Sequence, residues 1–336
     1  MTAVPEGAAV PEGAATGVGS LPGTDIVAAL RLVLDELPDL AHLPELPARG
    51  PGADLIGRSA GLLVELPVEV YAGRWRTASR PGRDARRTAD LWERDLDALT
   101  GAADGYTGTL KVQCAGPWTL AAAIDRPIGG ALLRDPGAVR DLTASLAEGV
   151  VAHVTEVSRR VPGATLLVQL DEPSLPAVLA GQVPTESGLH MYRAVEDAPA
   201  REALATVIQA AGVPVVVHCC APDAPIGLLR EAGAAGVGLD LDLLKDLDPL
   251  GELLESGGVL LAGALPSTGT VAPPSAEVAD RVSDVWRRLG FPVAGLPGQV
   301  VVTPACGMAG ATPAYARGAY RSARDAARRL VDLAHE

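Results

Sequence analysis

The sequence predicts an α/β protein built as a single (β/α)8 TIM barrel, and three observations lead to this fold class. Short apolar runs rich in β-branched residues alternate with longer amphipathic runs through most of the 336 residues, which is typical of a parallel sheet with crossover helices. The short runs are apolar along their whole length, as expected of strands that are buried on both faces. Polar side chains gather where these runs end, and in a barrel those ends form the rim that carries the active site.

The barrel is expected to span residues 16–336 and to follow a flexible leader at residues 1–15. In the leader the heptapeptide "AVPEGAA" occurs twice, and its Pro and Gly residues interrupt any regular structure. The eight predicted strands lie in segments 16–20, 40–46, 108–116, 165–173, 213–220, 236–242, 259–267 and 299–307.

Amphipathic helices are predicted between the strands, for example over residues 138–161. The last predicted helix begins at Pro313, because Thr312 is a favourable N-cap and proline suits the first helical position. Residues 68–78, "VEVYAGRWRTA", match neither pattern and are expected to form an extra hairpin or a long loop.

The net charge of −13 argues against nucleic acid and anionic membranes as partners, although solubility alone also explains such a charge. The sequence has no secretory signal and no apolar run long enough to span a bilayer, so a cytoplasmic location is expected. Disulfides are rare in that compartment. Clustered cysteine and histidine residues therefore indicate a metal site or catalysis before a structural crosslink.

Polar side chains end six of the predicted strands: Ser20, Asp171, Glu172, His218, Cys220, Asp240, Asp242, Ser267 and Cys306. Side chains alternate along a strand, so His218 and Cys220 share one face and Cys219 takes the other. With Cys306 and a carboxylate from the sixth strand, they form a donor set that suits Zn²⁺. Cys114 and Cys219 are expected to pack as small apolar residues.

Four segments at these strand ends resemble the catalytic barrel of cobalamin-independent methionine synthase: "TGVGSLPGTD", "VQLDEPSL", "VVVHCCA" and "VTPACGM". The resemblance runs from Thr16 to the C-terminus. It implies that zinc is held by a His-x-Cys pair, a carboxylate and a final cysteine. The implied zinc ligands are His218, Cys220, Asp242 and Cys306, with Asp240 as the alternative carboxylate.

The same resemblance implies that Ser20 and Asp171 bind the carboxylate and amine of homocysteine. A further glutamate that holds the amine in the family is matched to Glu65. The sequence departs from the family on the side of the methyl donor. It has one barrel instead of two, no histidine after the seventh strand to protonate the departing folate, and Ala123 where the family stacks folate on tryptophan. Trp118 lies near that position, and His190 is the histidine that a loop could bring to the rim.

The expected function is zinc-dependent transfer of a methyl group to the thiol of homocysteine, which forms methionine. The resemblance implies a methyltetrahydrofolate-type donor. Two alternatives stay open: a methylcorrinoid donor, and a zinc- or thiol-binding homologue that does not catalyse. A porphyrin-type decarboxylase ranks last, because its polycarboxylate substrate requires arginines at the rim and the predicted strand ends carry none.

Overall fold

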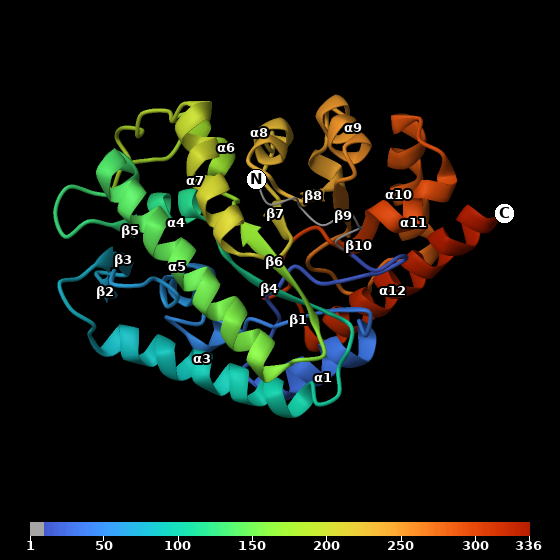
Figure 1. Cartoon of the computed structure of the whole chain (residues 1–336), viewed down its shortest axis with the longest axis horizontal. Coiled ribbons are helices and arrows are strands. Elements are labelled where there is room, and N and C mark those ends of the chain that lie inside the picture. The colour runs from blue at the N-terminus through green and yellow to red at the C-terminus, as the bar shows by residue number, and fades with distance from the viewer. Residues whose placement is uncertain (1–9) are drawn as a thin grey trace.

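The computed structural model describes residues 10–336, and its centre is a curled sheet of seven parallel strands in the order β1-β4-β6-β7-β8-β9-β10 (Figure 1). Each strand pairs in parallel with its neighbours, as expected for strands joined by crossover helices. The strands are β1 Leu40–His42, β4 Thr109–Ala115, β6 Thr165–Asp171, β7 Val215–Cys219, β8 Gly236–Asp240, β9 Val259–Leu265 and β10 Val300–Pro304. The predicted α/β barrel class is confirmed.

The eighth position of the barrel is filled by an extended segment that forms no regular strand, in contrast to the strand predicted at residues 16–20. Ala15 bridges Val302 of β10 at one end of the segment, and Ser20 bridges Glu45 beyond β1 at the other. Between them the Val18 carbonyl accepts hydrogen bonds from two side chains inside the barrel, Lys111 Nζ of β4 at 2.8 Å and Gln169 Nε2 of β6 at 2.9 Å. Backbone hydrogen bonds at both ends, such as Thr16 N–H to the Val302 carbonyl at 3.0 Å and Glu45 N–H to the Gly19 carbonyl at 3.1 Å, join the segment to β10 and to the end of β1.

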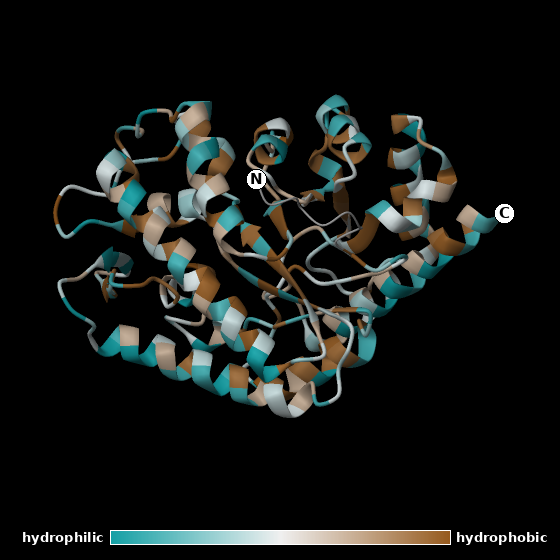
Figure 2. Cartoon of the chain, viewed as in Figure 1, coloured by the Kyte–Doolittle hydropathy of each residue, from teal (hydrophilic) through white to brown (hydrophobic). Residues whose placement is uncertain are grey.

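Helices surround the sheet, with apolar residues turned toward it and polar residues toward solvent (Figures 1 and 2). The longer helices are α1 Ile26–Glu36, α3 Arg83–Ala102, α5 Pro136–Arg160, α7 Asp197–Ala210, α9 Asp248–Glu255, α10 Ser275–Leu289 and α12 Pro313–His335. The shorter ones are α2 Leu55–Ala60, α4 Pro117–Ala123, α6 Leu175–Leu179, α8 Ile226–Glu231 and α11 Leu296–Gln299, with 3-10 turns η1 Pro47–Arg49, η2 Leu132–Arg134, η3 Leu241–Leu243 and η4 Val293–Gly295. Within residues 10–336, no helix is long and apolar enough to cross a membrane.

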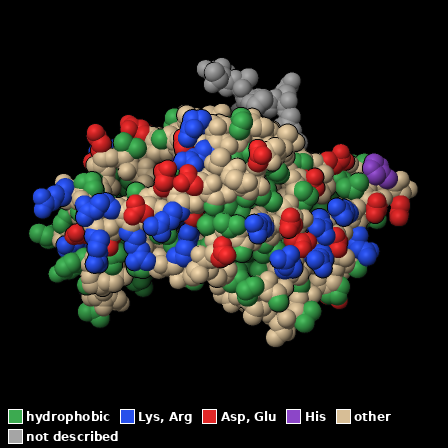
Figure 3. Space-filling view, turned by 90° about the horizontal axis from the view of Figure 1, so that it is seen from below, with side chains coloured by type: hydrophobic (Ala, Val, Ile, Leu, Met, Phe, Trp, Pro, Cys, Tyr) green, Lys and Arg blue, Asp and Glu red, His purple; other side chains and the backbone are tan. Residues whose placement is uncertain are grey.

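The start of the last helix agrees with the prediction. Thr312 Oγ1 accepts a hydrogen bond from the Tyr315 N–H at 3.1 Å, and Pro313 occupies the first helical position. Seen from below, the molecule displays many charged side chains, with Lys and Arg gathered in two areas of this face (Figure 3).

Residues 68–78 form a hairpin, the first of the two alternatives expected for them. Strands β2 Val68–Tyr71 and β3 Arg74–Thr77 pair antiparallel, and the short β5 Ile124–Asp125 adds to β3. Ala72 and Gly73 form the two-residue turn with positive φ angles of 48° and 80°, the backbone conformation that a tight hairpin turn requires.

Residues 10–15 are packed, in contrast to the flexible leader that the repeats predicted. Val10 and Ala14 are buried in a cluster with Leu40, Val216 and Val301, which lie in the amino-terminal halves of their strands. The Gly13 N–H donates to the Pro297 carbonyl at 2.9 Å. The apolar Val10 and Ala14 cover one end of the barrel, which fixes this part of the chain. Residues 1–9 of the expected leader lie outside the described residues.

Candidate functional site

The rim brings together four of the predicted site residues in two contacting pairs. His218 Nδ1 lies 2.9 Å from Asp171 Oδ1, because the two residues stand opposite each other in the β6–β7 register. Cys220 Sγ lies 3.1 Å from Cys306 Sγ, which joins the end of β7 to the end of β10. Asp171 and His218 are buried, whereas the two thiols are partly exposed. The carboxyl ends of the strands therefore carry a compact polar cluster.

His218 has a hydrogen-bond acceptor at each ring nitrogen. Its Nε2 lies 3.2 Å from the Ala305 carbonyl oxygen, and its Nδ1 faces the Asp171 carboxylate. A ring that donates at both nitrogens is a protonated imidazolium. Burial lowers the pKa of His218, but the hydrogen bond and the negative charge of Asp171 outweigh burial and hold this pKa above its ordinary value. As it lies here, the ring has no free nitrogen to offer a metal.

The two rim thiols share a proton. The hydrogen bond from Cys220 lowers the pKa of the Cys306 thiol to about 6, and the positive charge of His218 adds to this effect. The same contact and burial raise the pKa of Cys220. The contact with Cys220 therefore makes Cys306 the more acidic thiol of the pair. All four cysteines are free, and Cys114 and Cys219 are buried as expected.

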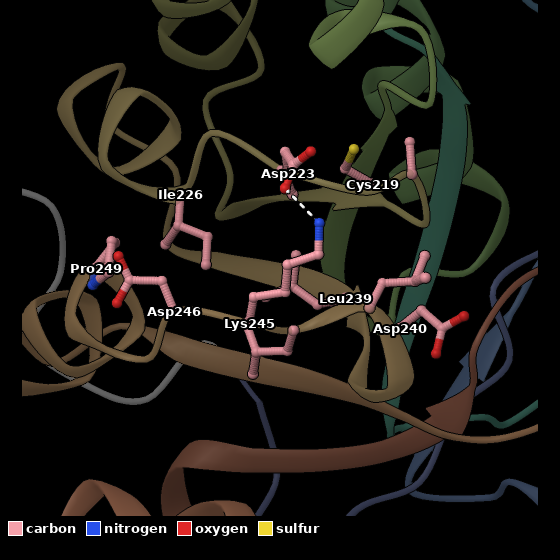
Figure 4. A pocket seen from close by; sticks show the side chains of 12 residues that line it. Cys219, Asp223, Ile226, Leu239, Asp240, Lys245, Asp246 and Pro249 are labelled. Carbon is pink, nitrogen blue, oxygen red and sulfur yellow. Dashed lines mark hydrogen bonds and ion pairs between the residues drawn. The ribbon is translucent and has the colours of Figure 1, made fainter.

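The carboxylates of the sixth predicted strand are engaged elsewhere. Asp242 forms an ion pair with Arg281 of α10 at 2.5 Å, and its side chain is 72% exposed. Asp240 Oδ1 accepts the Asp242 N–H at 3.0 Å and so caps the turn η3. Asp240 also lines a hollow of about 260 Å³ together with Cys219 and Lys245 (Figure 4). Cys219 thus opens away from the thiol pair, as the alternation along β7 predicts.

The residues fit zinc in chemical kind but do not form a complete site as they lie. Two thiols in contact and an imidazole beside them are the soft and borderline donors that zinc takes. The third and fourth positions are not assembled, because His218 contacts a carbonyl and Asp242 contacts an arginine. Among residues 10–336, no group of three His, Cys, Asp or Glu side chains is placed to hold a metal ion.

Ser20 lies at the same rim, next to the last cysteine in the chain. A Cβ on Gly307 would lie 2.0 Å from Ser20 Oγ, so the glycine leaves the space that the hydroxyl occupies. The Met308 N–H donates to the Ser20 carbonyl at 2.8 Å. The glycine-containing segment after Cys306 therefore holds Ser20 beside the thiol pair.

Glu45 is a rim carboxylate that sequence reasoning missed. It is 4% exposed, it bridges Ser20, and its Oε1 accepts a hydrogen bond from Gln113 Nε2 at 3.2 Å. Burial raises the pKa of Glu45 to about 7, although the positive charge of Arg58 opposes the shift. Glu65, which the resemblance matched to the glutamate that holds the substrate amine, is exposed and has a left-handed φ of 55°. The signal for Glu45 was present in the sequence, as an acid shortly after an apolar strand.

Glu172, the acid next to Asp171, is part of the scaffold. Its Oε1 accepts the Trp118 N–H at 2.9 Å, and its Oε2 accepts the Thr119 N–H at 2.8 Å and the Thr119 hydroxyl at 2.7 Å. These bonds satisfy amides in the first turn of α4. Burial raises the pKa of Glu172 to about 7. The carboxylate has its hydrogen bonds within the protein and is not directed at the rim cluster.

On the side of the rim expected to bind the donor, the aromatic and imidazole groups are placed differently. Trp118 is 3% exposed, and its indole N–H donates to the Ala200 carbonyl at 3.0 Å. Ala123 ends α4 and is half-buried. His190 is exposed, in a turn where Thr185 donates to its carbonyl oxygen. Trp118 is therefore packed among the helices, where it lines a hollow of about 550 Å³ with residues of α5 and α7.

Comparison with known proteins places the chain beside methyltransferases. Residues 108–329 match the family described as "Cobalamin-independent synthase, Catalytic domain". A solved structure of a B12-independent methionine synthase from Shewanella sp. W3-18-1, in complex with selenomethionine, matches with a TM-score of 0.62 and 12% identity, covering 96% of this chain and 99% of that one. A methyltransferase from Methanosarcina mazei matches with a TM-score of 0.57 and 12% identity, covering 94% of each chain. No curated protein matches. At such identities the two structures establish the fold alone.

Proposed function

Because the chain belongs to the cobalamin-independent methionine synthase family of catalytic domains, we propose that it is a zinc-dependent methyltransferase that moves a methyl group to the thiol of homocysteine and forms methionine. The observation that carries the proposal is the contact between the Cys220 and Cys306 thiols beside the Asp171–His218 pair. Soft donors gathered at a barrel rim suit a site that binds and activates a sulfur nucleophile. The reaction requires no nucleic acid or membrane partner, and free thiols suit the cytoplasm.

Homocysteine binds through groups that lie beside the thiol pair. Ser20 receives the substrate carboxylate, and the substrate ammonium lies between Asp171 and Glu45. In support, the contacts of Asp171 with His218 and Gln169 are both at Oδ1. Among residues 10–336, no side chain or amide is hydrogen-bonded to Oδ2, which leaves this oxygen for the substrate ammonium. Two buried carboxylates close to one hydroxyl match a zwitterionic amino acid.

In this proposal zinc is held by His218, Cys220 and Cys306 together with Asp242, or with Asp240 as the alternative carboxylate. The metal, when bound, keeps a coordinated thiol ionised at neutral pH. Asp171 keeps its contact with Nδ1 and so orients the imidazole. His218 must release the Ala305 carbonyl, and the carboxylate must leave its present partner. A comparison of zinc affinity in Asp242→Asn and Asp240→Asn decides between the two carboxylates.

The chemical step is a nucleophilic displacement. The homocysteine thiolate attacks the methyl carbon, a carbon–sulfur bond forms, and the bond from that carbon to the donor breaks. The electron pair of the broken bond leaves with the donor. A methyltetrahydrofolate donor leaves as an amine and requires a proton, whereas a corrinoid donor leaves as the reduced metal complex and does not.

One specific observation favours the corrinoid as a second candidate donor. Trp118 is buried against Ala200, and the sequence from Pro266 to Pro274, after β9, contains no histidine. An amine leaving group therefore lacks the histidine that the resemblance implies after this strand, and the Trp118 indole N–H is engaged with the Ala200 carbonyl. The acceptor and the metal stay the same in either case.

The test is an assay of methionine formation from homocysteine with zinc-loaded protein and each donor in turn. We expect turnover with at least one of methyltetrahydrofolate and methylcobalamin, and one zinc per chain. Tight binding of homocysteine without turnover on either donor would support the non-catalytic, thiol-binding alternative. A protein that binds neither zinc nor homocysteine would contradict the proposed function.

A further inference from the structure

A second polar site lies away from the rim, on helix α3. Arginines lie along one stripe of this helix, at Arg83 and at positions three, four and eleven residues after it. Such spacing places side chains on one face of a helix. They line an open hollow of about 730 Å³, to which η1 contributes another arginine. The arginines of this hollow are Arg49, Arg83, Arg86, Arg87 and Arg94. The hollow therefore gathers five positive charges in a chain whose net charge is −13.

The positive charge of the hollow is largely uncompensated. Arg49 forms a bidentate ion pair with the buried Asp95. Arg83 lies 3.9 Å from Asp84 and its side chain is 92% exposed. Arg87 donates to the Arg49 carbonyl oxygen at 2.7 Å, which fixes its side chain without neutralising it.

The remaining two arginines of the stripe have no acidic partner. Arg86 and Arg94 form no ion pair with any residue that the structure describes, 10 to 336. Asp90 is the acid that lines the hollow. Apart from the 3.9 Å contact of Arg83 with Asp84, the four arginines of α3 thus share one acid that lines the hollow, Asp90.

The acids on the other side of α3 are paired, which makes the contrast sharper. Arg160 of α5 contacts Glu93 at 3.4 Å and Asp97 at 2.6 Å. The acids of this face thus share one arginine of the neighbouring helix, which also contacts Glu156 at 2.5 Å, while the arginine face opens to solvent. The view from below shows Lys and Arg gathered in the half of the molecule where Figure 1 places α3 (Figure 3). Like charges at this spacing repel, and arginine in a first helical turn opposes the helix dipole. A bound anion would relieve both effects.

We propose that this arginine hollow binds a small oligophosphate anion. Guanidinium groups bind phosphate oxygens in pairs of parallel hydrogen bonds, and they do so better than any other side chain. The hollow has the volume of a small-molecule site, and five of the eight residues that line it are arginines. Several phosphates on one short chain match several arginines on one helix face. The site is independent of the methyl-transfer site and does not depend on the proposed function.

The experiment is isothermal titration calorimetry of the full-length protein with inorganic triphosphate. We expect one triphosphate per chain, bound at least tenfold more tightly than inorganic phosphate and more weakly as salt is raised. The double variant Arg86→Gln/Arg87→Gln should lose at least tenfold in affinity. The matched control is Arg287→Gln/Arg288→Gln, an adjacent and exposed arginine pair on α10, which should change affinity less than twofold.

A parallel titration with a nucleoside triphosphate separates two sources of the same chemistry. Equal affinity assigns the site to the phosphate chain alone, and tighter binding of the nucleotide adds a contact to the base or sugar. Circular dichroism and the melting temperature verify that both double variants are folded. Absence of triphosphate binding by the wild type, or an equal loss in the two double variants, would overturn the proposal.

Discussion

The two halves of the rim differ in how their polar groups are used. In the half at β7 and β10, side chains that end strands face each other, with contacts of 2.9 Å between His218 and Asp171 and 3.1 Å between Cys220 and Cys306. In the half at β4 and α4, polar groups form hydrogen bonds within the fold itself: Glu172 caps α4, and the Trp118 indole N–H donates to a backbone carbonyl. Under the proposed function, the β7–β10 half is the acceptor site for a thiol amino acid, and the β4–α4 half has no comparable cluster of rim side chains among residues 10–336.

The largest expected effect tests whether the thiol half is the metal site. Cys306→Ser should reduce zinc from one per chain to near zero and abolish methionine formation, because it removes one of the two soft donors. Cys219→Ser should leave both unchanged, because Cys219 is buried on the opposite face of β7. Zinc content is measured by inductively coupled plasma mass spectrometry. Equal zinc loss in the two variants would break the assignment of faces.

The donor half is tested by restoring what it lacks. Ser267→His places an imidazole just after β9, and a positioned general acid contributes about 10²–10⁴-fold to a rate. We expect turnover with methyltetrahydrofolate to rise at least about tenfold. Turnover with methylcobalamin should not change, since that leaving group needs no proton. An equal rise with both donors would mean that the substitution acts through the fold and not as an acid.

Asp171→Asn tests how the thiol half is held together. The substitution removes the charge that orients His218 at Nδ1, and changes of this kind typically lower metal affinity or activity about 10–100-fold. Zinc affinity is measured by competition with a chromogenic chelator. Asp223→Asn is the control, because that residue pairs with Lys245 on the surface. Unchanged zinc affinity in Asp171→Asn would remove Asp171 from the metal site and leave it a role in substrate binding alone.

Glu45→Gln tests the proposed ammonium site through its pH dependence. Burial raises the pKa of Glu45 to about 7, so its carboxylate becomes ionised between about pH 6 and pH 8. Homocysteine affinity should rise over this range in the wild type and stay flat in the variant. At pH 8 the lost charge-assisted hydrogen bond, about 1.5–3 kcal/mol, weakens binding about 10–100-fold. Glu65→Gln, on an exposed turn, should behave as wild type.

The same raised pKa fixes the sign of a stability effect. A carboxyl whose folded pKa exceeds its unfolded value stabilises the fold fully below the unfolded pKa, and this stabilisation is lost as pH rises through about 7. Glu45→Gln should therefore gain stability relative to wild type between pH 6 and pH 8. Urea unfolding at the two pH values measures this, and a relative loss would contradict the burial of an ionisable Glu45.

Local sequence patterns predicted the strands and much of the rim. Alternation along β7 correctly separated Cys219 from His218 and Cys220, because strand geometry depends on adjacent residues alone. Contacts between distant segments escaped prediction. Glu45 lies three residues past β1, beyond Pro44, where alternation no longer applies. The pairing of Asp242 with Arg281 joins residues 39 apart, and nothing local to either one indicates it.

Glycines and short apolar residues account for the other differences. The segment from Thr16 to Ser20 has the composition of a strand end, but it pairs with its neighbours only near its two ends, and the Val18 carbonyl between them is bound by the side chains of Lys111 and Gln169. Val10 and Ala14 are short apolar side chains within a Pro- and Gly-rich repeat, which gives no local sign that they are buried. Their burial follows from the open end of the barrel, which the local sequence does not encode.

Zinc K-edge X-ray absorption on the loaded protein, with and without homocysteine, tests directly whether Cys220 and Cys306 hold the metal. Two cysteine ligands should give two sulfur scatterers at about 2.3 Å, and homocysteine should raise the number to three. Such a change would place the acceptor thiol at the metal of the thiol half. Two scatterers that stay unchanged while homocysteine binds, or fewer than two before it is added, would contradict the central claim that Cys220 and Cys306 form the site at which the thiol is activated.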